Sequence, residues 1–178
     1  TGKKNLLEVW PHLELYVHGA VNFEPYREQF KRLIPSESMY YLETYNASEG
    51  FFGIQDQKDS NDLLLMLDYG VYYEFIPMEE VDKEYPNTVS LAEVELEKNY
   101  AMVISTNAGL WRYMIGDTIK FTSKYPYRLK ITGRTKHFIN AFGEEVIIEN
   151  AEAAITAASK ATGALISDYT AGPVYMEN

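Results

Sequence analysis

Two short segments in the middle of the chain carry residue types that suit recognition of a nucleotide. Residues 110–117 form an aromatic- and Arg-bearing stretch that ends in Gly116-Asp117, and Gly133-Arg134 follows seventeen residues later. Glycine lets the backbone turn sharply, which leaves the Asp117 carboxylate facing outward as an acceptor for the vicinal hydroxyls of a ribose. Arg134 offers a planar donor fork to a phosphate or a carboxylate. Gly-Asp is also common in ordinary turns, so this interpretation depends on the neighbouring segments.

A third segment, residues 45–50 (Tyr-Asn-Ala-Ser-Glu-Gly), leaves a predicted strand as small residues between an aromatic ring and a carboxylate. Ala47 and Gly50 allow a ligand to approach the backbone, and the Ser48 hydroxyl can donate to a phosphate oxygen. Glu49 supplies the hard oxygen ligand that Mg²⁺ prefers, with water and substrate phosphates as the other ligands. An ordinary strand-to-loop turn is the alternative.

Two further segments have both a structural and a functional interpretation. Residues 18–21 (His-Gly-Ala-Val) end a predicted strand, where glycine permits contact with a flat ring, but a core turn is the alternative. Lys136 and His137 lie between two well-patterned segments. They indicate either a solvated turn or a hinge, since a hinge is a few loop residues that absorb backbone rotation.

The composition favours a soluble protein with a small ligand. The chain has 178 residues, 46% of them hydrophobic, which is enough for a sizeable core in one or two domains. Its net charge of −10 argues against a nucleic-acid backbone or an anionic membrane as partner. The chain has no cysteine, and its three histidines show no ligand spacing. No apolar run approaches the roughly 20 residues that span a bilayer, so we expect a cytoplasmic protein.

Hydrophobic periodicity predicts the elements that position these residues. A helix over residues 23–33 lies between predicted strands at 13–17 and 38–44, an order typical of an α/β crossover between parallel strands. From residue 63 onward, closely spaced short strands predict a small antiparallel or barrel-like part beside that sheet. Its strands are expected at 63–67 and 72–76, which form a hairpin, and at 90–97, 100–105, 112–115, 118–123 and 128–132.

The C-terminal part is predicted to begin with a hairpin of residues 138–140 and 145–148. A helix follows, with Asn150 as its N-cap and Gly163 at its end, and then strands at 164–169 and 173–176. The chain opens with Thr-Gly rather than Met and stops as a strand begins. We therefore expect a piece of a longer protein.

In chain order, these segments resemble the motifs of the acyl-adenylate-forming superfamily, which includes acyl-CoA synthetases, luciferases and peptide-synthetase adenylation domains. The details look most like the auxin-responsive Gretchen Hagen family of acyl-acid amido synthetases, in a bacterial-type version. That family favours Tyr-x-x-Ser-Glu and Tyr-Arg-Tyr-x-x-Gly-Asp, and Trp10-Pro11 and residues 73–77 also resemble it. The resemblance covers nearly the whole chain. The matching segments are residues 18–21, 45–49, 111–117, 133–136 and 143–144.

The resemblance implies a role for the residues that would surround the base and the α-phosphate. Tyr45 would stack near the adenine, with Gly19 and Ala20 forming part of its floor. Asn46 belongs to the same motif and is placed with the nucleotide-binding residues. Ser48 would touch the α-phosphate and is counted with the catalytic residues.

The resemblance also implies roles for four charged residues. Glu49 would hold Mg²⁺ and serve catalysis, and Asp117 would take the ribose hydroxyls. Arg134 would contact the ribose or a phosphate from the domain junction. Lys136 would be the pivot about which a small C-terminal domain turns between two half-reactions.

The implied fold is α/β: part of an α/β sheet subdomain, a β-barrel-like subdomain and the start of a small α+β C-terminal lid domain. Residues 1–133 would be the C-terminal part of the large domain, residues 134–137 the hinge, and residues 138–178 the beginning of the lid. The superfamily's phosphate loop and the catalytic lysine of its lid are absent from this chain. The missing N- and C-terminal parts of the same enzyme are therefore expected partners.

The implied function is that of an ATP-dependent ligase that uses ATP and Mg²⁺. It would convert a carboxylic acid into an acyl-adenylate with release of pyrophosphate, and pass the acyl group to an amine such as an amino acid. The chain by itself is expected to be inactive. Two alternatives stay open: a ligase that passes the acyl group to coenzyme A or another thiol, and a non-catalytic ligand-binding module.

Overall fold

The computed structural model describes residues 2–19, 23–135, 138–141, 144–167 and 169–170. Its main element is an eight-stranded mixed sheet with the strand order β1-β2-β3-β4-β8-β7-β6-β5, and β9 and β10 form a separate two-stranded sheet. The sheet strands are β1 (Leu15–Gly19), β2 (Tyr40–Ala47), β3 (Gly50–Gln55), β4 (Leu63–Leu65), β5 (Val71–Pro77), β6 (Asn99–Thr106), β7 (Tyr113–Lys124) and β8 (Tyr127–Arg134). The strands of the small sheet are β9 (Phe138–Ala141) and β10 (Glu144–Ile147). The α-helices are α1 (Arg27–Leu33) and α2 (Ile148–Thr162), and the short 3-10 helices are η1 (Leu6–Glu8), η2 (Glu24–Tyr26) and η3 (Met78–Glu80).

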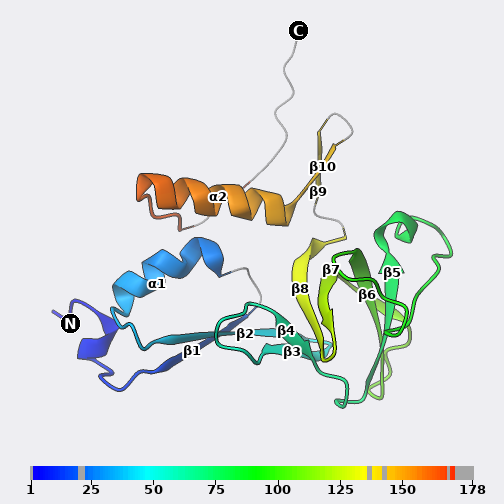
Figure 1. Ribbon diagram of the computed structural model, residues 1–178, viewed down its shortest axis with the longest axis horizontal. Helices are drawn as coiled ribbons and strands as arrows, with labels where there is room; N and C mark the ends of the chain where they lie inside the picture. Colours follow the sequence, from blue (N-terminus) through cyan, green and yellow to red (C-terminus); the bar gives the residue numbers. More distant parts are fainter. Residues whose placement is uncertain (1, 20–22, 136–137, 142–143, 168, 171–178) are drawn as a thin grey trace, which may run out of the picture.

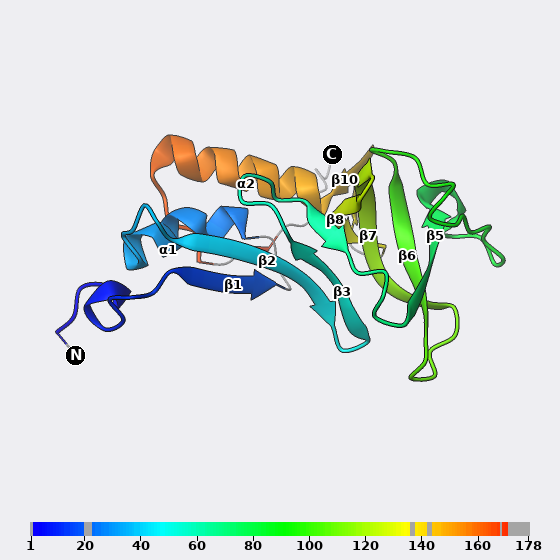
Figure 2. The same cartoon turned by 60° about the horizontal axis from the view of Figure 1, so that its bottom comes forward.

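The N-terminal part of the sheet is the predicted α/β crossover. β1 and β2 are parallel and in register from Leu15 opposite Tyr40 to Gly19 opposite Thr44, and η2 and α1 lie between them in the chain. Phe23, which opens this connection, is buried. Figures 1 and 2 show α1 and α2 side by side on the same side of β1 and β2. The α/β class is confirmed.

The rest of the sheet curls around an aromatic core. The ring centroids of Phe52 in β3 and Tyr73 in β5 lie 6.4 Å apart. In a flat sheet these strands would be five spacings, roughly 24 Å, from each other. Phe75, Phe121 and Tyr100 continue the ring contacts, with centroid distances of 5.0 to 6.4 Å. Because side chains from distant strands meet inside the curl, the prediction of a barrel-like part is confirmed.

The predicted hairpin of residues 63–67 and 72–76 is wrong, although both segments contain strands. β4 lies between β3 and β8, whereas β5 pairs with β6 at the edge of the sheet. Leu63 and Leu65 are 1% and 3% exposed, and this short buried strand takes a neighbour on each side. Alternation along the chain identifies a strand but not its partner.

The predicted strand at residues 90–97 is also wrong. The backbone N–H and hydroxyl of Ser90 both donate to the Glu93 carboxylate, and the N–H of Glu93 donates back to the Ser90 carbonyl. These local bonds form a turn that competes with sheet pairing. Val94 is nonetheless fully buried, so the apolar residues that suggested a strand fill the core from a loop.

The predicted C-terminal hairpin is confirmed, and β9 and β10 are antiparallel. The helix start is corrected, because β10 ends at Ile147 and α2 begins at Ile148 with no residue between them. Asn150 therefore lies inside the helix rather than at its N-cap. The helix end is confirmed at Gly163, which has φ +69° and donates its N–H to the Ser159 carbonyl.

The strand predicted at residues 164–169 is not present in residues 164–167 and 169, and residues 173–176 lie outside the described residues. The large sheet ends at Arg134 with β8, and the small sheet starts at Phe138. The division of the chain at residues 134–137, and the hinge, stay predictions. Among the residues described, no helix has the length and apolar character needed to cross a membrane.

Candidate active site

An irregular segment of β7 places Asp117. Between the pairs Ala101–Thr118 and Val103–Met114, β7 has three residues where β6 has one. Such a bulge bends a strand locally and redirects its side chains. The prediction of separate strands at 112–115 and 118–123 is therefore wrong: Gly-Asp interrupts the pairing without ending the strand.

Glycine is required at the centre of this bulge. Gly116 has φ +88°, and a Cβ atom there would lie 3.1 Å from Nη2 of Arg134. Its carbonyl accepts the N–H of Thr135 at 2.8 Å. Because the backbone is left-handed and Arg134 lies against it, the glycine lets the two motif residues Asp117 and Arg134 pair directly across β7 and β8.

Two further register shifts lie beside the same site. The pairing of β7 with β8 shifts between Thr118 and Ile119, and the pairing of β2 with β3 shifts between Tyr45 and Asn46. Three irregular pairings thus surround the predicted site residues of β2, β7 and β8. The regularly paired strands hold the core, and the irregular pairings determine the direction of the polar side chains of the predicted site.

Tyr45 and Arg134 hold the Asp117 carboxylate from two sides. The Tyr45 hydroxyl donates to Oδ2 of Asp117 at 2.8 Å. Nη1 of Arg134 lies 3.6 Å from Oδ1, and Nη2 of Arg134 donates to the Ile115 carbonyl at 3.1 Å. Burial and the neighbouring Asp117 carboxylate raise the pKa of Tyr45, so the phenol stays a neutral donor.

Glu49 presents an ionised carboxylate close to this group. The Ser48 hydroxyl donates to Oε2 of Glu49 at 2.8 Å. That hydrogen bond, the backbone N–H of Glu49 and the Tyr113 side chain lower the pKa of Glu49, with a smaller contribution from the Arg134 charge. The structure therefore brings together Tyr45, Glu49, Asp117 and Arg134, as well as Ser48.

The remaining predicted site residues are placed differently. A Cβ atom on Gly19 would lie 2.7 Å from the Thr44 carbonyl oxygen, so its missing side chain permits close packing of β1 on β2. Asn46 Oδ1 lies 3.1 Å from the Thr44 hydroxyl. Ala20 and Lys136 lie outside the described residues. Their roles, and that of Gly19 in an adenine floor, stay predictions.

The stacking role of Tyr45 also stays a prediction. Its side chain is 4% exposed and meets Phe52 edge-to-face at 5.1 Å between centroids. The atom that it directs at other site residues is the hydroxyl oxygen.

Sequence reasoning gave no separate role to Tyr113, whose side chain helps to lower the pKa of Glu49. The available signal was its position four residues before Asp117, matching the four residues from Tyr45 to Glu49.

The chemistry of the donor set fits a magnesium nucleotide. Among the described residues, no three His, Cys, Asp or Glu side chains gather as a metal cage. One ionised carboxylate suffices for Mg²⁺, which keeps several waters and shares substrate phosphates. Asp117 offers carboxylate oxygens to hydroxyl groups, and the half-exposed Arg134 offers donors to an anion.

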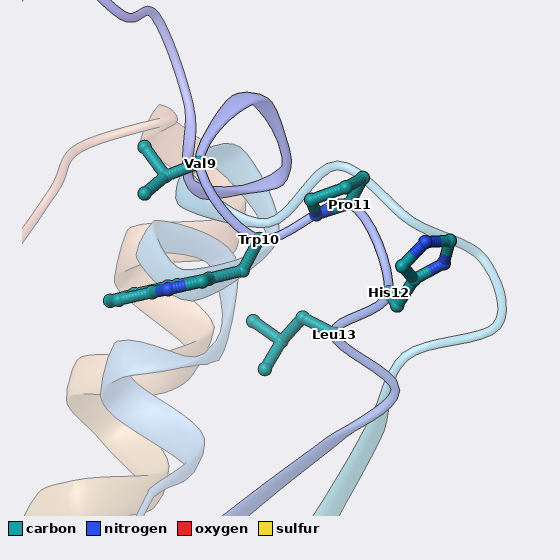
Figure 3. Close-up of a pocket in the computed structure, with 5 residues that line it drawn as sticks. All are labelled: Val9, Trp10, Pro11, His12 and Leu13. Atoms are coloured by element: carbon teal, nitrogen blue, oxygen red, sulfur yellow. The ribbon is translucent and has the colours of Figure 1, made fainter.

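A separate open hollow lies at the segment that follows η1, and Figure 1 shows this N-terminal part of the chain at the opposite end of the molecule from β7 and β8. It is lined by the consecutive residues 9–13, and Figure 3 shows Trp10 and Leu13 on one side of that turn while His12 points away. A ligand site usually joins polar groups from several elements. All the residues that line this hollow belong to one continuous segment. The candidate site is therefore the cluster of Asp117, Tyr45, Arg134 and Glu49.

Comparison with known proteins shows which family this chain is similar to. The profile of the GH3 family central domain matches residues 64–134. Indole-3-acetic acid-amido synthetase GH3.3 of Arabidopsis thaliana is 34% identical over 127 residues, which cover 67% of this chain and 21% of that protein. Jasmonoyl-L-amino acid synthetase JAR4 of Nicotiana attenuata is 32% identical over 121 residues, which cover 64% of this chain and 20% of that protein. The chain thus spans about a fifth of the length of these relatives.

A solved structure, the GH3.15 acyl acid amido synthetase, matches with a TM-score of 0.70 at 19% identity, over 87% of this chain and 28% of that one. A second solved structure, AtGH3.15 acyl acid amido synthetase in complex with 2,4-DB, matches with a TM-score of 0.62 at 18% identity. The match covers 80% of this chain and 25% of that chain. The fold is therefore that of part of an acyl acid amido synthetase. Residues 64–134 thus match the GH3 family central domain, and the chain is similar to amido synthetases of that family.

Proposed function

We propose that this chain is part of an ATP-dependent acyl acid amido synthetase that acts in the cytoplasm. The enzyme forms an acyl-adenylate from a carboxylic acid and ATP, releases pyrophosphate, and transfers the acyl group to an amine such as an amino acid. The names of the relatives, which conjugate indole-3-acetic acid or jasmonate, support this reaction class. The observation that carries the proposal is the joint placement of Asp117, Arg134 and Glu49.

Each of the three charged residues has a task in this reaction. Asp117 accepts hydrogen bonds from the ribose hydroxyls, and Arg134 orients the ribose or a phosphate. Glu49 holds Mg²⁺, which offsets the negative charge that gathers at the phosphates. Their combined contribution is orientation and charge stabilisation at the α-phosphate. Lys136 remains our proposed pivot for the change between half-reactions.

The test is carboxylate-dependent exchange of pyrophosphate into ATP, measured on the complete gene product that carries this sequence. Loss of one positioned electrostatic group commonly costs ~10²–10³ in rate, so Glu49→Ala and Asp117→Ala should be nearly inactive. Glu84→Ala, which removes an exposed carboxylate from the loop after η3, is the matched control and should retain the wild-type rate. If either site variant keeps more than about a tenth of the activity, that residue does not belong to the site.

The same assay separates the proposal from its alternatives. Supplying an amino acid or coenzyme A after adenylation, and identifying the product, distinguishes an amido synthetase from a thiol ligase. A folded protein that shows no exchange with any acid in a broad panel would contradict adenylation and leave the ligand-binding module.

A further inference from the structure

Two tyrosine–carboxylate contacts cross the candidate site in opposite directions. Tyr45 of β2 donates to Asp117 of β7 at 2.8 Å, and Tyr113 of β7 helps to lower the pKa of Glu49, which follows β2. β3, β4 and β8 separate β2 from β7 in the sheet order. Each tyrosine therefore acts on a carboxylate that lies on the other side of the curl.

The ring and the hydroxyl of Tyr45 have separable tasks. The ring is 4% exposed and packs edge-to-face on Phe52 in the aromatic core. Phenylalanine has the same ring and would make the same contact. The hydroxyl is the only part of the side chain that reaches the polar site, where it donates to a carboxylate, and hydrogen bonds to charged groups are the stronger ones.

The hydroxyl also decides how the carboxylate is presented. It occupies Oδ2 of Asp117 and leaves Oδ1 on the side of Arg134, 3.6 Å from Nη1. Arg134 is itself held by the Ile115 carbonyl. Without the hydroxyl, Asp117 would be free to rotate and to move toward the guanidinium, because one of its two restraints would be gone.

We propose that Tyr45 is a positioning residue that acts through its hydroxyl, fixing the Asp117 carboxylate in the orientation that receives the ribose hydroxyls of a nucleotide. This inference rests on the proposed function and gives Tyr45 a task distinct from stacking on the base. It implies that nucleotide affinity, rather than the rate of the chemical step, depends on the hydroxyl.

The test compares Tyr45→Phe with Tyr73→Phe in the complete gene product. Tyr73 is a matched control because it is equally buried, belongs to the same core, and donates its hydroxyl to the backbone carbonyl of Met66 at 3.0 Å. Equilibrium binding of AMP is measured by calorimetry, and the KM for ATP and kcat are measured in the exchange assay. Thermal unfolding of both variants reports the structural cost of losing a buried hydroxyl.

We expect Tyr45→Phe to weaken AMP binding and raise the KM for ATP about tenfold, which corresponds to about 1.4 kcal/mol, with kcat changed less than threefold. Tyr73→Phe should bind AMP within twofold of wild type, although it should lose about as much thermal stability as Tyr45→Phe does. Equal AMP binding by the two variants would overturn the positioning role.

AMP binding tests the positioning role and pyrophosphate exchange tests adenylation, so either proposal can be contradicted without the other. If wild type catalyses exchange and Tyr45→Phe binds AMP normally, the positioning role is wrong and adenylation stands. If wild type binds AMP without exchange and Tyr45→Phe binds it weakly, the positioning role stands and adenylation is wrong. If wild type neither binds AMP nor catalyses exchange, both are wrong.

Discussion

At the scale of single residues, Glu43 is a carboxyl group whose titration is linked to folding. It lies on β2, and burial raises its pKa to about 7, with further contributions from Glu24 in η2 and Glu152 in α2 that outweigh the opposing charge of Arg27. The folded chain therefore holds this proton at pH values where the unfolded chain releases it. Stability from this group is fully present below pH 4.5 and is lost as the pH rises through about 7.

We predict that Glu43→Gln stabilises the chain at pH 8 and has little effect at pH 4.5, because glutamine is neutral at every pH. The gain at pH 8 should be about 3 to 3.5 kcal/mol, since the pKa rises from 4.5 to about 7 and each pKa unit corresponds to about 1.4 kcal/mol. Urea unfolding of both proteins at several pH values between 4.5 and 8 measures the difference. Glu37→Gln, at an exposed position in a turn, is the control and should parallel wild type. A pH-independent difference between Glu43→Gln and wild type would contradict the linkage.

At the scale of elements, the bulge in β7 depends on one glycine. We predict that Gly116→Ala destabilises the chain by about 1–3 kcal/mol, the usual cost of forcing a non-glycine residue into a rare backbone conformation. The new methyl group would also displace Arg134 and so weaken nucleotide binding in the complete gene product. Gly109→Ala, at φ +104° with open space around its Cβ position, controls for backbone strain alone.

Urea unfolding measures the first effect and calorimetric AMP binding the second. Both glycine variants should lose stability, but only Gly116→Ala should lose affinity. Wild-type AMP binding by Gly116→Ala would show that Arg134 does not need its present position.

Sequence patterns predicted most of the elements, because alternation and helical spacing depend on local burial. They failed where partners are chosen over long distances, as for β4, which joins β3 to β8 instead of pairing with β5. They failed again where β10 passes directly into α2, since Asn150 suits an N-cap but lies inside the helix. In the site, the motifs predicted Asp117, Arg134 and Glu49 as neighbours, but nothing in the chain order indicates that Tyr45 reaches Asp117.

At the scale of the whole molecule, one curled sheet joins the crossover at β1 and β2 to the barrel-like part. The larger hydrophobic cluster includes Tyr45 and Phe52 from one part and Phe75 and Phe121 from the other, so the two parts share this core. The chain nevertheless spans about a fifth of the length of its relatives, and the guanidinium described beside Asp117 is that of Arg134.

We predict that the isolated 178-residue chain shows no steady carboxylate-dependent pyrophosphate exchange, because one Arg cannot neutralise the charge of a triphosphate in the transition state. The complete gene product, assayed under the same conditions, is the positive control. Circular dichroism establishes that the isolated chain is folded. Steady turnover by the folded chain would contradict this prediction.

The bulges around the site make the length of its motifs as important as their composition. Because side chains alternate between the two faces of a strand, loss or gain of one residue exchanges the faces of everything beyond it. A deletion at Gly116 would turn the Asp117 carboxylate away from Tyr45 and carry Ile119 and Phe121, both now fully buried, out of the core. The segment between Tyr113 and Asp117 should therefore tolerate neither insertions nor deletions, in addition to its need for glycine at position 116.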